Sequence, residues 1–137
     1  MNNPLFSKEY SGDYFSDGKH LKPQFVDLWA DELGQVFGQE NLNKHQMRAF
    51  FNETKRLQAI YHVKNDFDAV CTKLLSMKAQ AHLRRRRKNG IPEQFRKFIE
   101  INVDKVTKDP KNPKKFEAFV QHFEAVAAYC EGRLRKG

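Results

Sequence analysis

Apolar residues recur three and four positions apart from residue 23 to near the end of the chain. This spacing places them on one face of an α-helix. Residues that favour helix ends divide the pattern into five segments, approximately 23–37, 44–63, 66–88, 92–106 and 116–130. No run alternates apolar and polar residues as a half-buried strand would. The sequence therefore predicts an all-α protein, a compact bundle of about five helices with mostly short connections and no β-sheet.

Individual residues support these helix ends. The side chain of Asn43 is placed to cap the amide of Gln46 at the start of the second segment. Gly38 is expected to stop the first helix, and Asn89 with Gly90 the third. The inward stripes predict one hydrophobic core that includes Phe50, Phe51, Leu57, Leu74, Phe95, Phe119 and Phe123.

Residues 1–22 precede the helical pattern and differ from it. They are rich in Asn, Ser, Gly and Asp, and their aromatic residues Phe6, Tyr10, Tyr14 and Phe15 follow no clear period. We expect a flexible N-terminal arm, with residues 23–137 forming a single helical domain. The aromatic rings of the arm could stack on nucleic-acid bases or dock on a neighbouring protein.

The charge of the chain suggests a polyanionic partner. Its 137 residues contain 25 Lys and Arg against 17 Asp and Glu, a formal net charge of +8. The start lacks a basic segment followed by an apolar run, and no stretch approaches the roughly 20 apolar residues that a membrane helix needs. We therefore expect a cytoplasmic protein without a membrane partner.

The basic residues concentrate on the third predicted helix. No acidic residue occurs between Asp68 and Glu93, whereas that window holds seven cations: Lys73, Lys78, Arg84, Arg85, Arg86, Arg87 and Lys88. Lys78, His82 and Arg85 continue the angular sector that is apolar in the first half of the helix. A solvated helix end explains one or two cations through the macrodipole, but not four consecutive arginines that repel one another. The pattern favours binding of phosphates, which arginine pairs through two oxygens at once.

The second predicted helix carries a weaker polar stripe. Its members share one sector and are Lys44, Arg48, Asn52, Lys55 and His62. Every amphipathic helix has a polar side, so this stripe is equally compatible with a solvated face and with a second binding surface.

The fifth predicted helix carries acidic residues on one sector, where Glu117, Gln121, Glu124 and Glu131 fall together. This sector repels phosphate. It is a candidate face for the basic surface of a protein neighbour, and a solvated face is the simpler interpretation.

Signatures of catalysis or of cofactor binding are missing from the sequence. The five histidines show neither paired helical spacing with a carboxylate nor a companion cysteine pair suited to zinc. Cys71 and Cys130 fall on apolar stripes and are expected to be reduced core residues. His62 and His82 could act as acid and base in RNA cleavage, but a histidine beside cations more often donates to phosphate. We expect a protein that is not an enzyme, with no metal and no cofactor.

Three segments, in the same order, resemble the small subunit of type III-A CRISPR effector complexes. The second segment reads QMRAFFNETKRLQ over residues 46–58 and follows the Arg-x-Phe-aromatic-Asn-Glu-x-Lys/Arg-Arg-Leu pattern of that family. KLLSMKAQAHLRRRRK resembles its basic third helix, and FEAFVQHFEAVAAY its closing helix. Residues 79–87 depart from the Lys-rich Leu-Ala-Tyr stretch usual there.

The resemblance implies a non-catalytic subunit that is present in several copies beside the backbone and large subunits of the Csm complex. There it would clamp guide RNA and its paired target RNA in antiviral defence. The residues expected to contact RNA are Arg48, Asn52, Lys55, Arg56, Lys78, His82, Arg84, Arg85, Arg87 and Lys88. Two other classes stay open: a helical DNA-binding regulator that uses the basic third helix, and an RNA-processing enzyme. Recognition helices usually read bases with N-terminal residues, whereas these arginines end their helix.

Overall fold

The computed structural model describes residues 2–85 and 90–136. Its elements are the 3₁₀ turns Pro4–Phe6 and Pro23–Phe25 and the helices α1 (Leu28–Gln39), α2 (Lys44–Lys64), α3 (Phe67–Arg85), α4 (Glu93–Thr107) and α5 (Lys114–Cys130). Two isolated β-bridges, Phe15 with Leu21 and Asn43 with Arg135, are the only β-type pairing in the described residues. The predicted all-α fold and the number of helices are confirmed.

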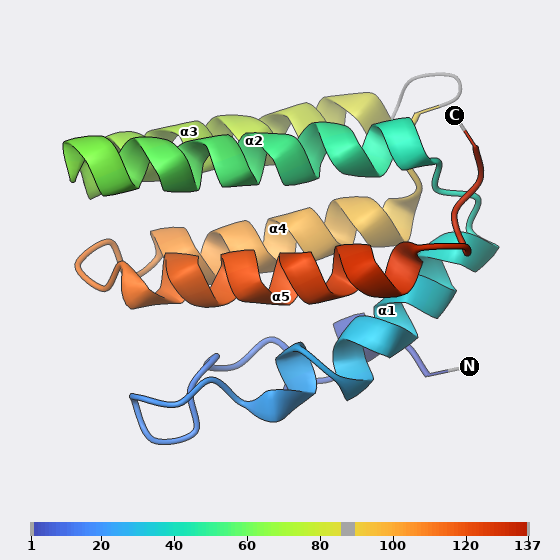
Figure 1. Cartoon of the computed structure of the whole chain (residues 1–137), viewed down its shortest axis with the longest axis horizontal. Coiled ribbons are helices and arrows are strands. Elements are labelled where there is room, and N and C mark those ends of the chain that lie inside the picture. The colour runs from blue at the N-terminus through green and yellow to red at the C-terminus, as the bar shows by residue number, and fades with distance from the viewer. Residues whose placement is uncertain (1, 86–89, 137) are drawn as a thin grey trace.

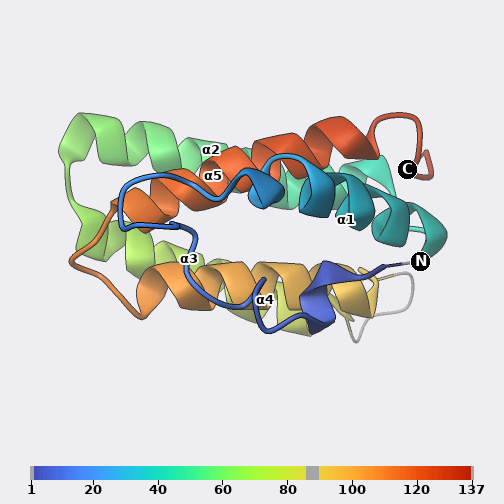
Figure 2. The same ribbon diagram turned by 90° about the horizontal axis from the view of Figure 1, so that it is seen from below.

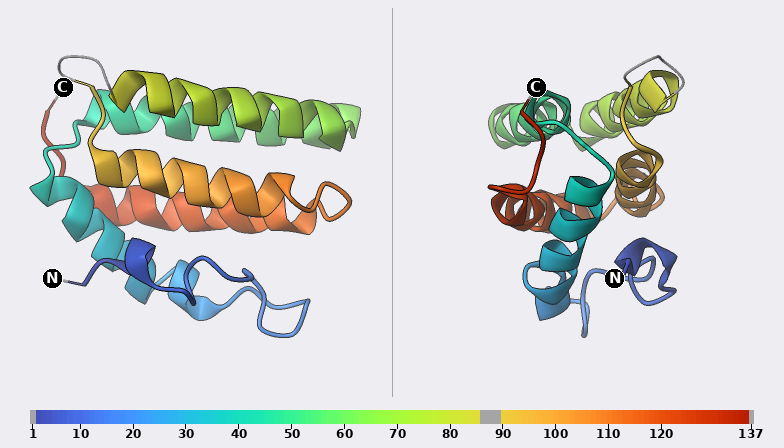
Figure 3. Two further views of the ribbon diagram at one scale, coloured as in Figure 1. Left: turned by 180° about the vertical axis from the view of Figure 1, so that it is seen from behind. Right: turned by 90° about the vertical axis from the view of Figure 1, so that its right-hand side faces the viewer.

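The helices stack in three layers (Figure 1). α2 and α3 form the first layer, α4 and α5 the second, and α1 with the N-terminal segment of residues 2–22 the third. The end-on view in Figure 3 shows α2 to α5 at the corners of a four-helix arrangement, with α1 against its lower side. α1 packs mainly on α5, and α3 packs mainly on α4.

The helix ends follow local side-chain chemistry. Asn43 accepts a hydrogen bond from the Gln46 amide at 2.8 Å, and the Gln46 side chain accepts from the Asn43 amide at 3.1 Å. This capping box confirms the predicted start of α2. α1 differs from the prediction, because it begins at Leu28 after a 3₁₀ turn and continues past Gly38 to Gln39. Asn89, the expected cap of α3, lies outside the described residues.

Two glycines of α1 permit a close approach to the end of α5. A Cβ at Gly34 would lie 2.7 Å from the Tyr129 carbonyl oxygen, and one at Gly38 would lie 2.9 Å from the Arg133 carbonyl oxygen. Gly38 therefore serves packing and not the termination that the sequence suggested. In the same region Arg133 donates to the Asp31 carboxylate at 2.7 Å.

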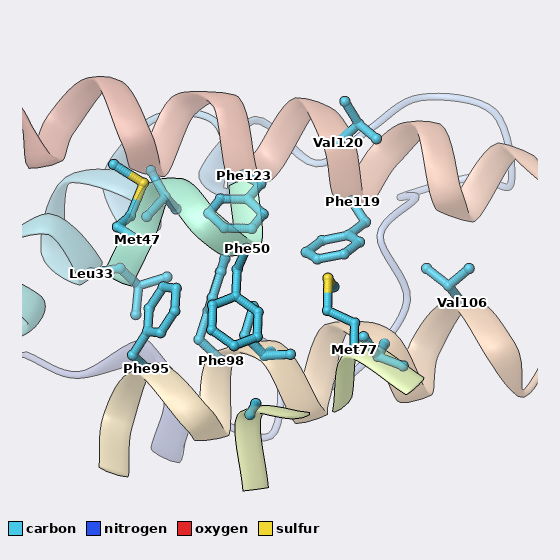
Figure 4. Packing of buried hydrophobic residues seen from close by; sticks show 14 of the residues in the cluster. Leu33, Met47, Phe50, Met77, Phe95, Phe98, Val106, Phe119, Val120 and Phe123 are labelled. Atoms are coloured by element: carbon cyan, nitrogen blue, oxygen red, sulfur yellow. The ribbon is translucent and has the colours of Figure 1, made fainter. Parts of the chain in front are cut away.

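The predicted core forms as one cluster between the layers (Figure 4). Six of its seven expected members are buried: Phe50, Leu57, Leu74, Phe95, Phe119 and Phe123. Phe51 is half-buried, with its ring 5.3 Å from that of Phe123 between centroids. Cys71 and Cys130 are buried and unpaired, as expected.

The N-terminal segment differs from the flexible arm that its composition predicted. Residues 2–22 run along α4 and then cross to α1 (Figure 2). Tyr10 and Tyr14 are fully buried in the common core, and Leu5 is 4% exposed. The segment contains no α-helix, so its apolar residues do not recur at helical spacing. The sequence therefore contained no sign that these residues are buried.

A buried hydrogen-bond network fixes this segment to the second layer. Tyr14 donates its hydroxyl to Asn102 at 2.6 Å, and Asn102 donates to the Tyr10 hydroxyl oxygen at 3.0 Å. His122 lies 2.7 Å from that hydroxyl through Nε2 and bonds the Phe25 carbonyl through Nδ1. The carbonyl can only accept, so Nδ1 carries the proton and Nε2 accepts from Tyr10. These links join the N-terminal segment to both α4 and α5.

Burial controls the ionisation of the network. Desolvation lowers the pKa of His122 to about 3, since the ring is fully buried. The nearby Lys105 lowers this pKa further, while the bond to Phe25 opposes the shift. Neutral His122 is also the only form that can accept from Tyr10 while donating to Phe25.

Truncation of Phe119 tests the core. Phe119→Ala should lower the free energy of unfolding by about 3 to 5 kcal/mol, because a fully buried ring is replaced by a cavity. Urea unfolding would measure this change. Val63→Ala is the control: Val63 is 83% exposed, so its truncation should change stability by less than about 0.5 kcal/mol. Similar effects of the two substitutions would contradict the assignment of Phe119 to the core.

Acid should destabilise the fold through His122. The unfolded chain protonates this ring near pH 6.5, whereas the folded chain does so only near pH 3. Between these values the unfolded state binds more protons, so the free energy of unfolding should fall as pH decreases, by up to roughly 1.4 kcal/mol per pH unit. Urea unfolding between pH 7 and pH 5 would compare the wild type with His122→Gln. Equal dependence of the free energy of unfolding on pH in the two proteins would refute the assignment.

Candidate nucleic-acid interface

The polar stripe of α2 lies against the acidic sector of α5. Lys55 is 3.3 Å from the Glu124 carboxylate, and Lys44 is 3.7 Å from that of Glu131. Two further polar side chains of α2 share one carboxylate, since Glu117 lies 2.8 Å from His62 and accepts from Gln58 at 2.7 Å. Cations of α2 and acids of α5 therefore partly neutralise each other within the chain.

Ion pairs also hold part of the basic end of α3 against α4. Lys78 donates to the Asp104 carboxylate at 2.7 Å. Arg85 Nε lies 3.1 Å from Glu93 Oε2, an ion pair without the geometry of a hydrogen bond. Hydrogen bonds from Arg96, followed by the charges of Arg96 and Arg85, hold the pKa of Glu93 below its usual value. These two cations of α3 are engaged within the bundle.

A groove of about 290 Å³ lies between α2 and α3, and we call it the α2–α3 groove. Its lining consists of Ala49, Phe50, Glu53, Arg56, Lys73, Ser76, Met77, Gln80 and Arg84. Three of these side chains are cationic and come from both helices. Arg56 is paired with Glu53 of its own helix at 3.0 Å. Lys73 and Arg84 form no ion pair with any described residue, so the groove keeps a net positive charge.

Arg84 is placed by contact with the groove floor. Its guanidinium carbon lies 5.3 Å from the centroid of the Phe50 ring, within the range of a cation–π contact. The ring is 3% exposed and its position is fixed by the core. This contact orients a cation at the mouth of the groove without neutralising it.

A second hollow, of about 210 Å³, lies between α2 and α5. Arg48 and Asn52 line it together with Lys44 and Glu131. Arg48 is exposed and has no ion pair to a described residue, whereas Lys44 faces Glu131. This hollow therefore offers one unneutralised cation.

The eight described residues among the ten expected to contact RNA do not form one surface. Arg56 and Arg84 line the α2–α3 groove, and Arg48 and Asn52 line the hollow on the other side of α2. Lys55, Lys78 and Arg85 are in ion pairs, while His82 is exposed near the end of α3. Arg87 and Lys88 lie outside the described residues. None of these positions tests RNA contact, which stays a prediction.

Lys73 lines the groove, although it is not among the ten residues expected to contact RNA. Its place on an outer helix face looked ordinary, because any amphipathic helix has charged residues there. The distinguishing feature is the neighbouring helix, since α2 brings Arg56 to the same groove. A signal of this kind comes only from packing.

The described residues meet neither the requirements of a membrane-spanning helix nor those of a metal site with three side-chain ligands. None of its helices is both long and apolar enough to span a membrane. Residues 2–85 and 90–136 also hold no cluster of three His, Cys, Asp or Glu side chains suited to a metal ion.

The fold and the surface define a small, basic helical-bundle protein with unneutralised cations on both sides of α2, among others. A family model described as Csm2 Type III-A matches residues 20–132, most of the chain. The chain belongs to this family, and it is thus a small subunit of a type III-A CRISPR effector complex, which contains further Csm subunits. Neither the curated proteins nor the solved structures yielded a match.

Proposed function

We propose that the chain binds RNA without cutting it, and that it clamps guide RNA and its paired target against the backbone subunits of the complex. Further copies of the chain would bind side by side along the same RNA. Membership of the Csm2 family and the net charge of +8 support this proposal. The observation that carries it is the α2–α3 groove, where Lys73 and Arg84 have no carboxylate partner among the described residues.

The groove suits the RNA backbone better than base edges. Long cationic side chains on two facing helices can reach successive phosphates from both sides. Such contacts fix the position of a strand and carry little sequence information. A clamp that serves many guide sequences needs this kind of contact, and arginine is suited to it through its planar fork.

RNA binding should depend on salt through the unneutralised cations. Each phosphate contact that is lost should flatten the slope of log affinity against log salt by about 0.7 for single-stranded RNA. Lys73→Ala combined with Arg84→Ala should therefore flatten the slope by about 1.4 and weaken binding to unrelated sequences alike. Fluorescence anisotropy with labelled RNAs across a salt series would measure both effects, on the isolated chain and on the assembled complex.

Two kinds of control sharpen this experiment. Lys8→Ala with Lys19→Ala removes the same charge from exposed residues of the third layer, opposite the groove, and should change the slope little. Arg85→Ala should weaken binding less than Arg84→Ala, because Arg85 already faces Glu93. Equal slopes for the groove variant and the third-layer variant would remove the groove from the site.

The same samples test the absence of cleavage. Labelled RNA incubated with the protein and Mg²⁺ should remain intact on a denaturing gel. Cleavage that co-purifies with the wild type and is lost in His82→Ala would instead support an RNA-processing enzyme. Tighter binding to duplex DNA than to RNA at the same salt would favour the DNA-binding regulator.

A further inference from the structure

A separate pocket of about 430 Å³ lies where the N-terminal segment meets the end of α4 and the start of α5. Three lysines line it, Lys105 and Lys108 from α4 and Lys115 from α5. Its acidic lining residues are Asp13 and Asp104. The pocket lies on the second and third layers, away from the α2–α3 groove, and the proposed RNA contacts do not use it.

Lys105 is an unusual residue for such a position. Its ammonium is largely buried, donates to the Tyr10 carbonyl, and lies 4.3 to 4.7 Å from the ring centroids of Tyr10, Tyr14 and Phe25. It forms no ion pair with a carboxylate of the described residues. A buried charge normally has a counter-ion, because desolvation otherwise disfavours it strongly.

The charged groups around Lys105 do not supply that counter-ion. Burial, followed by repulsion from Lys22, lowers the pKa of Lys105 to about 7; Asp13 opposes this shift and Lys115 adds to it. Tyr10, Tyr14 and His122 are neutral neighbours, since burial raises the pKa of both phenols and lowers that of the imidazole.

Neither acidic residue of the lining forms an ion pair with Lys105. Asp104 accepts from Lys78 at 2.7 Å, and Asp13 accepts from the Phe15 amide at 3.1 Å. Lys115 is 3.3 Å from Asp109, while Lys108 is exposed and unpaired among the described residues. The pocket thus gathers more positive charge than its own acids balance.

We propose that this pocket binds a phosphate monoester, whose oxygens pair with Lys105, Lys108 and Lys115. A phosphate monoester carries about −1.5 to −2 charges at pH 7 and three strong acceptor oxygens, which suit a pocket lined by three lysines better than a carboxylate does. Tyr14 and Ile101 form an apolar wall, and the volume is in the range of small-molecule sites. The group is the 5′ phosphate of a mononucleotide or the terminal phosphate of an RNA strand, which share this chemistry.

Calorimetric titration of the full chain with AMP and adenosine tests the proposal. AMP should bind and adenosine should not, and Lys108→Ala should weaken AMP binding roughly five- to tenfold through loss of one charged contact. Lys111→Ala is the matched control, because Lys111 is exposed in the same region but does not line the pocket. Equal effects of the two variants, or equal binding of adenosine, would overturn the proposal.

Proton uptake gives a second readout that is specific to Lys105. A bound anion stabilises the charged amine, so at pH 7.5 AMP binding should take up more than about half a proton, measured in buffers of different ionisation enthalpy. Lys105→Met should abolish both the uptake and the binding. Binding of AMP without uptake would contradict the role of Lys105.

A third titration distinguishes the two sources of the phosphate. If the terminal phosphate of RNA is the ligand, a 5′-phosphorylated oligonucleotide should bind more tightly than its 5′-hydroxyl form, and Lys108→Ala should remove that difference. Binding of the 5′-hydroxyl form should still depend on Lys73 and Arg84. Absence of binding by AMP and absence of a preference for the 5′ phosphate would together refute the pocket while leaving the groove untouched.

Discussion

The placement of the N-terminal segment on the second layer depends on one buried set of hydrogen bonds, in which Asn102 connects Tyr14 to Tyr10 and His122 connects Tyr10 to Phe25. Each polar atom of this set is far from water, and an unmatched one would cost about 1 to 3 kcal/mol. These hydrogen bonds therefore hold the N-terminal segment in one position. That placement closes the lower side of α4 and α5 (Figure 1), and it also brings Tyr14 to the lining of the pocket at Lys105.

A second constraint is the distribution of charge between neighbouring helices. α2 meets the acids of α5, and α3 meets the acids of α4, so cations that lie on these two sides gain partners inside the chain. The groove between α2 and α3 holds two cations without an ion pair to a described residue, Lys73 and Arg84 of α3, whereas Arg56 of α2 is paired with Glu53. Net charge alone suggested a polyanion partner, whereas the packing indicates which of the basic residues are available to one.

Much of the fold could be predicted because helical periodicity is a local property. The stripes that carry Phe95 and Phe119 specify inward faces without knowledge of the neighbouring helix. The course of residues 2–22 could not be predicted in this way, since Tyr10 and Tyr14 are fixed by partners about 90 to 110 positions away. The same limitation applies to the candidate site, because the sequence identified Arg84 and Arg85 together. The structure distinguishes them, since Arg84 lies over Phe50 in the groove and Arg85 is paired with Glu93.

The distinction between paired and unpaired cations is one of degree, and its scale follows from exposure. Lys55 and Glu124 are each more than a third exposed, and pairs of this kind contribute about 1 kcal/mol or less. A phosphate that binds such a lysine must first break its ion pair, and the loss of about 1 kcal/mol lowers the affinity for RNA by a factor of about five. Paired cations such as Lys55 therefore remain accessible to RNA at a modest cost, and Lys73 and Arg84 are accessible without it. For this reason we expect RNA to engage the α2–α3 groove first, and the flanking ion pairs to exchange partners only when further contacts hold the strand close.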